Sequence, residues 1–192
     1  MHHDQRFDEA RRRLLRGAAG VMVCATAVQA VSAAGAEPAK LAPQQGDELA
    51  FASYENDGRH VQAADLQPGA APLLVYPRDP ASGVIRERSR LNQILLLRLS
   101  PAEAIAAGLD AASAGVIAFS GICTHAACAV SEWNAELRHF VCPCHASEYD
   151  PVKKARVVGG PAPRALPTLP IAWREDRYVI VGPFSGAVGA PA

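Results

Sequence analysis

The sequence predicts an all-β domain, an antiparallel sandwich or barrel with one short helix, preceded by an N-terminal targeting segment. Beyond residue 48, short apolar runs alternate with Pro and Gly, as is typical of antiparallel sheets. Four of the five cysteines fall between Cys123 and Cys144, which points to one concentrated site. The formal net charge is zero, so no basic field is available for a phosphate backbone, and nucleic acid is not an expected partner.

Residues 1–36 have the pattern of an export signal. Four arginines stand within 11–16 without an acidic residue, and 17–36 contain no charged side chain. The adjacent arginines resemble a twin-arginine signal, so we expect export to the periplasmic side. The apolar stretch is just long enough to span a bilayer but weakly hydrophobic, and Ala34-Gly35-Ala36 offers a small-residue cleavage site. A cleaved signal and a retained membrane anchor helix both remain open.

Residues 37–47 contain Pro and Gln and are expected to link this segment to a domain at 48–192. The expected strands of the domain are the apolar runs Leu49–Tyr54, Leu73–Tyr76, Ile94–Leu99, Val116–Phe119, Leu137–Cys142, Leu169–Trp173 and Tyr178–Val181. A four-residue hairpin loop, Arg174–Arg177, is expected between the last two strands.

One short helix is expected directly after Ser100. Ser100 is a favourable N-cap, Pro101 fits the first helical position, and Glu103 completes a capping box. Gly108 can end the helix.

Two short boxes carry the residues for metal chemistry. In the first, Cys123 and His125 form Cys-x-His; in the second, Cys142 and His145 form Cys-x-x-His. The sixteen residues between His125 and Cys142 allow a strand pair that brings both loops together. Thiolates and imidazoles suit both iron and zinc, so the ligand types permit an iron–sulfur cluster or a structural zinc site. A zinc site would leave the cysteines at 128 and 144 without a role.

Through these boxes and the residues that follow them, 121–163, the sequence resembles the Rieske iron–sulfur proteins. The resemblance implies a Rieske-type β-sandwich with a small cluster-binding subdomain at about 120–163 and a [2Fe-2S] cluster as cofactor. Carried over by position, the implied ligands are Cys123 and Cys142 on one iron, and His125 and His145 on the other.

The resemblance also assigns roles to neighbouring residues. Cys128 and Cys144 fall where the respiratory branch of the family has a disulfide, which suits an exported protein. Ser147 and Tyr149 match a serine and a tyrosine that donate hydrogen bonds to a cluster sulfide and to a ligand cysteine; such donors raise the reduction potential. Gly160-Pro161-Ala162-Pro163 matches the loop that covers the cluster. Without the family, these last residues form an ordinary turn and ordinary packing contacts.

The sequence departs from the cytochrome bc branch at three positions. Ala126-Ala127 stands where Leu-Gly is usual, and Ala146 stands where Gly is usual. Loss of the Leu side chain leaves the cluster less covered, and an Ala in place of Gly needs a backbone conformation that Ala tolerates. Both kinds of departure, the lost Leu side chain and the alanines in place of glycine, argue against direct quinol docking.

The function implied is one-electron transfer as the iron–sulfur subunit of a respiratory quinol–cytochrome c reductase of the cytochrome bc type. The alternative is the small Rieske subunit of a periplasmic molybdenum oxidoreductase such as arsenite oxidase. Expected partners are membrane cytochrome subunits or a large catalytic subunit, a c-type cytochrome or cupredoxin as acceptor, and quinol as donor in the first case. No independent catalytic site is evident in the sequence, so substrate chemistry belongs to a partner. A zinc-bearing interaction module of the cell envelope is the alternative from a non-redox class.

Overall fold

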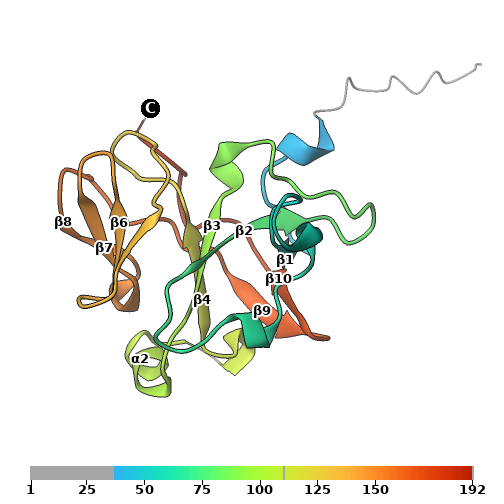
Figure 1. Cartoon of the computed structure of the whole chain (residues 1–192), viewed down its shortest axis with the longest axis horizontal. Coiled ribbons are helices and arrows are strands. Elements are labelled where there is room, and N and C mark those ends of the chain that lie inside the picture. Colours follow the sequence, from blue (N-terminus) through green and yellow to red (C-terminus); the bar gives the residue numbers. More distant parts are fainter. Residues whose placement is uncertain (1–36, 110, 192) are drawn as a thin grey trace, which may run out of the picture. The chain divides into compact units, whose positions relative to one another are not determined.

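The computed structural model describes residues 37–109 and 111–191, so the targeting segment predicted at 1–36 lies outside the described part. Two antiparallel sheets form the framework of this part, with one short α-helix (Figure 1). The predicted all-β, antiparallel fold class is therefore confirmed. Over 37–109 and 111–191, no helix combines the length and the apolar character that crossing a membrane requires.

The larger sheet has six strands in the order β4-β3-β2-β1-β10-β9. Their bounds are β1 Glu48–Ala50, β2 Leu73–Arg78, β3 Ile94–Arg98, β4 Val116–Ser120, β9 Ile171–Arg174 and β10 Arg177–Ile180. The segment before β9 returns to β4, because Leu169 N donates to Ala118 O at 2.9 Å and Ser120 N donates to Pro167 O at 2.9 Å. The sheet thus curls back on itself around a first core that includes Leu49, Val75, Ile94, Leu96, Ile171 and Tyr178.

The smaller sheet has four strands in the order β5-β6-β7-β8. Their bounds are β5 Glu132–Asn134, β6 His139–Cys142, β7 Ser147–Asp150 and β8 Arg156–Gly159. A second core joins this sheet to the first, where the Phe119 ring meets the Phe140 ring edge-on at 5.8 Å between centroids.

Strand β3 is apolar at every position from 94 to 97 because both of its faces are buried. Ile94 and Leu96 face the first core, whereas Leu95 and Leu97 face the second. Successive side chains of a strand point to opposite faces, and both faces of β3 are covered, so no position there favours a polar residue.

The apolar runs located seven of the ten strands in 37–109 and 111–191, and the short strands β5, β7 and β8 were not predicted. The predicted loop Arg174–Arg177 is wrong in length. Arg174 pairs directly with Arg177, which leaves a two-residue loop of Glu175 and Asp176. Both loop residues have positive φ, +47° and +60°, as the twist of a tight hairpin requires.

The helix predicted after Ser100 is confirmed as α2, Pro101–Ala106. Ser100 Oγ accepts a hydrogen bond from Glu103 N at 3.3 Å, and Glu103 Oε2 accepts one from Ser100 N at 2.8 Å. Single 3₁₀ turns complete the secondary structure of the described residues: η1 Pro38–Lys40, η2 Asn56–Gly58, η3 Ala63–Asp65, η4 Arg90–Asn92, η5 Ala111–Ser113 and η6 Pro151–Lys153.

Residues 37–47, predicted as a linker, lie against the domain. The buried Arg86 guanidinium donates to both carboxylate oxygens of the buried Asp47, at 2.7 and 2.9 Å, and to Pro38 O at 3.1 Å. Asn92 Nδ2 donates to Leu41 O at 2.7 Å. Hydrogen bonds to both charged partners satisfy an ion pair that would be unfavourable in isolation, so this segment has a fixed path on the domain.

Candidate metal centre

The first box folds into a closed loop between β4 and β5. Ile122 pairs with Ala129 at the base of the loop, and Cys123 N donates to Cys128 O at 2.8 Å. Ala127 N returns a hydrogen bond to Cys123 O at 3.1 Å. Cys123 is therefore held on the inner, buried side of the loop.

The second box forms the turn of the β6–β7 hairpin. Cys142 ends β6 and pairs with Ser147, the first residue of β7, so the turn consists of residues 143–146. This register places Cys142 and Ser147 inside the molecule and exposes His145 on the turn.

A disulfide between Cys128 and Cys144 joins the two loops and confirms the predicted pairing. Cys123 and Cys142 stay as free, buried thiols. The sulfurs of Cys128, Cys142 and Cys144 lie within 4.8 Å of one another. Two of these three sulfurs are bonded to each other, and a metal requires a thiolate, so this group of three is not a metal site.

The two histidines of the boxes face each other across the loops. His125 Nδ1 lies 3.2 Å from His145 Nδ1, and the ring planes are 88° apart. Both Nδ1 atoms therefore approach one point, while His145 is exposed and His125 half-buried.

The spacing of the four predicted ligands argues against a single zinc ion. Ligands 2.0–2.3 Å from one ion are at most about 4.6 Å apart. Over the described residues, no three of these four side chains bring their ligand atoms within 4.8 Å of one another. The pair of thiols and the pair of imidazoles fit two irons better than one ion.

The Tyr149 hydroxyl lies against the first box. Tyr149 Oη is 3.2 Å from Cys123 Sγ, and it accepts a hydrogen bond from Thr124 N at 3.3 Å. Burial, together with the adjacent Cys123, raises the pKa of Tyr149 to about 12, so the hydroxyl keeps its proton and can donate to sulfur.

The two free thiols differ in acidity. Burial opposes ionisation of Cys123, but the Tyr149 hydroxyl and the His125 backbone N–H outweigh it, so the pKa of the Cys123 thiol is lowered. Burial raises the pKa of the Cys142 thiol, and the neighbouring Cys123 adds to the increase. The site thus stabilises one thiolate readily, whereas a second needs a nearby positive charge, which a metal supplies.

Ser147 is a fully buried residue whose hydroxyl has no hydrogen-bond partner among the described residues. It lies near enough to Cys123 to lower the pKa of that thiol, although the geometry falls short of a standard hydrogen bond. Leaving a buried hydroxyl unpaired costs about 1–3 kcal/mol. A cluster sulfide in the space that it faces would accept this hydrogen bond, so the orphaned hydroxyl fits the cofactor.

The predicted cover segment, residues 160–163, lies on the second loop. Gly160 has φ +75°, and a Cβ at this position would come 2.4 Å from Ala146 O and 2.5 Å from Ser147 Cα. Only a residue without a side chain allows this approach. Ala162 is buried in the second core, whereas Pro161 and Pro163 are exposed.

The sequence did not predict the roles of two further residues of the site, Thr124 and Arg164. Thr124 is fully buried, and its Oγ1 donates to Arg164 O at 2.6 Å. The Arg164 guanidinium donates in turn to Ala187 O at 2.7 Å and to Gly189 O at 2.6 Å. These contacts tie the first loop, the segment after Pro163 and the C-terminal segment together. Thr124 stands inside the first box, and Arg164 directly follows the cover, so their positions were the available signals.

The alanines that replace the usual glycines have the backbone conformation that favours glycine. Ala127 has φ +54° and Ala146 has φ +55°. The left-handed region costs a non-glycine residue roughly 1–2 kcal/mol. Each box loop therefore contains one strained residue close to the disulfide. Ala127 directly precedes Cys128, and Ala146 is two positions after Cys144.

The paired Cys/His loops, the disulfide between them and the buried hydroxyls form a site that suits an iron–sulfur cluster. Residues 86–170 match the sequence profile of the Rieske [2Fe-2S] domain, and the chain carries this domain. The [2Fe-2S] cluster is its implied cofactor.

Two relatives illustrate the range of similar proteins. The chain is 38% identical over 136 residues to a Haloferax mediterranei protein named as the putative Rieske subunit of a respiratory nitrate reductase, covering 70% of this chain and 58% of the relative. It is 42% identical over 76 residues to the cytochrome bc1 complex Rieske iron–sulfur subunit of Streptomyces lividans, covering 39% of this chain and 45% of the relative. The chain thus spans about half the length of these relatives.

Among solved structures, the chain is similar to the plasma membrane Rieske protein of the cyanobacterium Synechocystis, with 23% sequence identity and a TM-score of 0.37. The similarity covers 57% of this chain and 86% of that chain.

Proposed function

We propose that the protein transfers single electrons through a Rieske [2Fe-2S] cluster, as the iron–sulfur subunit of a respiratory quinol–cytochrome c reductase of the cytochrome bc type. The ligands proposed are the two free thiols, Cys123 and Cys142, and the Nδ1 atoms of His125 and His145. The observation that carries the proposal is the juxtaposition of these two pairs on loops that a disulfide joins.

When bound, the cluster supplies one-electron redox chemistry at nearly fixed geometry. The protein residues position and tune it. The Cys128–Cys144 disulfide holds the loops together, and Tyr149 donates toward the Cys123 sulfur. Ser147 is a second donor, because its buried hydroxyl has no hydrogen-bond partner among the described residues. Hydrogen bonds aimed at sulfur stabilise the additional negative charge of the reduced state and so raise the potential.

The exposure of His145 supports it as the site where electrons enter or leave. Its ring lies at the surface, whereas both free thiols and Tyr149 are buried. A partner that docks over the two loops would reach the imidazole edge without disturbing the sulfurs.

A second candidate is the Rieske subunit of another periplasmic oxidoreductase, such as a molybdenum enzyme, with a large catalytic subunit as partner. The Haloferax relative, named as a respiratory nitrate reductase subunit, covers more of this chain than the cytochrome bc1 relative does. The small side chain of Ala126 favours this candidate, because it covers the cluster less than the Leu that is usual in the cytochrome bc branch. Under either candidate, the arginine-rich segment 1–36 supports export by a twin-arginine route to the periplasmic side of the membrane.

Membranes from the native host, carrying either the wild-type protein or Cys142→Ser, test the proposal. The cytochrome bc assignment predicts that quinol-dependent reduction of cytochrome c is lost in the variant. Retention of that activity, with loss of nitrate- or arsenite-linked electron transfer instead, would replace the first candidate by the second. Retention of all these activities would contradict a role in respiratory electron transfer.

A further inference from the structure

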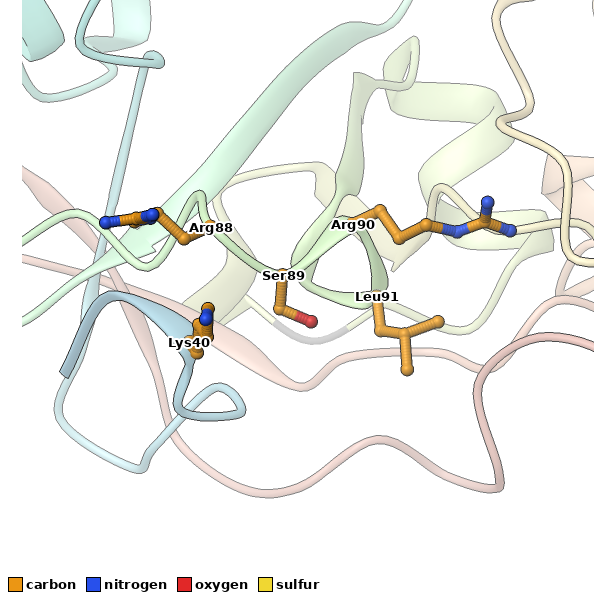
Figure 2. Close-up of a pocket in the computed structure, with 5 residues that line it drawn as sticks. All are labelled: Lys40, Arg88, Ser89, Arg90 and Leu91. Carbon is orange, nitrogen blue, oxygen red and sulfur yellow. The ribbon is translucent and has the colours of Figure 1, made fainter. Parts of the chain in front are cut away.

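A shallow, positively charged hollow lies beside the first box loop. It has a volume of about 430 Å³ and is lined by Lys40, Arg88, Ser89, Arg90 and Leu91. Figure 2 shows Arg88 and Arg90 extending to opposite sides of Ser89, while Lys40 comes from the separate η1 segment. Two parts of the chain that are far apart in sequence thus contribute cations to one surface.

The positive charge of the hollow is only partly neutralised. Lys40 and Arg88 both pair with the Glu37 carboxylate, Lys40 at 3.1 Å. Their side chains stay 55% and 62% exposed. Arg90 donates to a backbone carbonyl, which leaves its full charge in place. Two of these three cations therefore share one carboxylate and the third contacts none in these pairs, although the whole chain has a net charge of zero.

The hollow reaches the cluster loop itself. Arg90 Nη2 donates to Ala127 O, in the first box loop between His125 and Cys128. Leu91 is 44% exposed. Its Cδ2 and the Ala127 Cβ both lie beside Gly189, so the C-terminal segment connects Leu91 to the first box loop. Arginine is enriched at protein interfaces, and the exposed Leu91 adds apolar area beside Arg90.

We propose that this hollow docks the acidic face of the redox partner that exchanges electrons with the cluster. The inference rests on the proposed function, and it adds the charge and position of the docking surface. A negatively charged partner surface would complement Lys40, Arg88 and Arg90 and would bring its redox centre beside the first box loop. Complementary charge of this kind increases association rates.

Stopped-flow oxidation of the full-length, cluster-loaded protein tests the charge of this surface. The ascorbate-reduced protein is mixed with ferricyanide, an anion, or with tris(phenanthroline)cobalt(III), a cation. Each oxidant takes one electron from the reduced cluster, so that iron(III) becomes iron(II) or cobalt(III) becomes cobalt(II). Measurements use about 10 mM ionic strength, where the Debye length is about 30 Å, and are repeated at about 1 M, where it is about 3 Å.

The double variant Lys40→Glu/Arg88→Glu reverses charge without touching the box loops. We expect oxidation by ferricyanide to slow about tenfold and oxidation by the cobalt complex to accelerate by a similar factor at low salt. Glu37→Gln removes the carboxylate and should shift both rates the opposite way. Arg174→Glu, which reverses one exposed cation at the β9–β10 turn, is the control away from the hollow and should change neither rate.

The same variants then react with an acidic cupredoxin and a basic c-type cytochrome. The proposal predicts that the double variant loses rate with the acidic protein and does not lose rate with the basic one. Equal rates for wild type and double variant with every oxidant would overturn the proposal. Binding of the wild type, but not the double variant, to phosphatidylglycerol vesicles with unchanged oxidation rates would assign the hollow to a lipid surface instead. Absence of any ascorbate-reducible cluster would contradict the proposed function itself, which distinguishes the two failures.

Discussion

The Tyr149 hydroxyl lies 3.2 Å from the Cys123 sulfur, and both side chains are buried in the core that joins the two sheets. Strand β7 positions Tyr149, and the loop after β4 positions Cys123, so the contact depends on how the two sheets pack. Because burial and the adjacent Cys123 raise the pKa of Tyr149 to about 12, the hydroxyl is a permanent donor in the physiological range.

Removal of this hydroxyl should lower the reduction potential. A donor worth about 1.4 kcal/mol more to the reduced state corresponds to about 59 mV for a one-electron couple. We expect Tyr149→Phe to lower the potential by this order, and Ser147→Ala to act in the same direction. Redox titration followed by EPR measures both, and Tyr178→Phe, whose hydroxyl belongs to the first core, is the control. An unchanged potential in both variants would contradict the tuning roles.

The disulfide should contribute substantially to stability as well as to cluster retention. Cys128 and Cys144 are 16 positions apart, and closure of a loop of about 15 residues is worth about 3 kcal/mol in the chain-entropy account. We expect Cys128→Ser/Cys144→Ser to lower the free energy of unfolding by about this amount and to accelerate iron loss. Urea unfolding and timed iron analysis measure the two effects. An unaltered rate of iron loss would show that the bridge does not hold the cluster loops.

The strained alanines predict two stabilising substitutions. Ala127→Gly and Ala146→Gly relieve a positive φ in each box loop. The relief exceeds the added flexibility of glycine, so each should raise the free energy of unfolding by about 0.5–1 kcal/mol. Ala102→Gly in the helix α2 is the control and should lower it by about 1 kcal/mol. Destabilisation by all three variants would mean that the loop conformations do not strain alanine.

The cover segment should not tolerate a side chain at Gly160. A Cβ there meets the backbone of Ala146 and Ser147 at 2.4–2.7 Å, and a positive φ adds strain. We expect Gly160→Ala to destabilise the domain by about 2 kcal/mol or more, on the order of an overpacked core. Gly186→Ala is the matched control, because a Cβ added there would meet no heavy atom within 4 Å and its φ is not positive. Equal stability of the two variants, measured by thermal unfolding, would contradict the close contact between cover and loop.

Acid should weaken the contact between Arg59 and Asp65. The Arg59 guanidinium, which donates to both Asp65 oxygens at 2.7 Å, lowers the pKa of that carboxyl from its ordinary 3.8. A carboxyl with a lowered folded-state pKa stabilises the fold fully above the ordinary value, and this stabilisation is lost as the pH falls through the lowered one. Asp65→Asn should therefore reduce stability at neutral pH, and its deficit should shrink below about pH 4. Urea unfolding across this range would contradict the assignment if the deficit stayed constant.

The fold was predictable where burial dictates sequence. Apolar runs located β2, β3 and β4, and the capping residues located α2, because a buried strand and a capped helix each impose a local pattern. Strands β5 and β7 were not predicted because most of their side chains are polar, and β8 because its apolar run is only Val157-Val158; all three strands pair with neighbours in the sheet.

The sequence predicted the ligand residues of the two boxes but not the contacts that hold the two loops in place. Cys123 and His125 are recognised by their own short Cys-x-His spacing. The supporting contacts join distant positions instead: Thr124 and Arg164 are 40 positions apart, and Asp47 and Arg86 are 39 apart. Such contacts depend on the topology of the sheets, which no local pattern carries. The left-handed conformations of Ala127 and Ala146 could be expected only because glycine is usual at these positions in the family, since alanine itself does not favour that conformation.

EPR of the purified full-length protein, with parallel iron, sulfide and zinc analysis, shows whether the two box loops bind a Rieske cluster. We expect two irons and two sulfides per chain and a Rieske-type signal that ascorbate alone develops, as a cluster in the upper part of the range of about −150 to +300 mV requires. A signal that needs dithionite would contradict the tuning by Tyr149 and Ser147. Zinc in place of iron, with no signal under either reductant, would contradict the cluster itself.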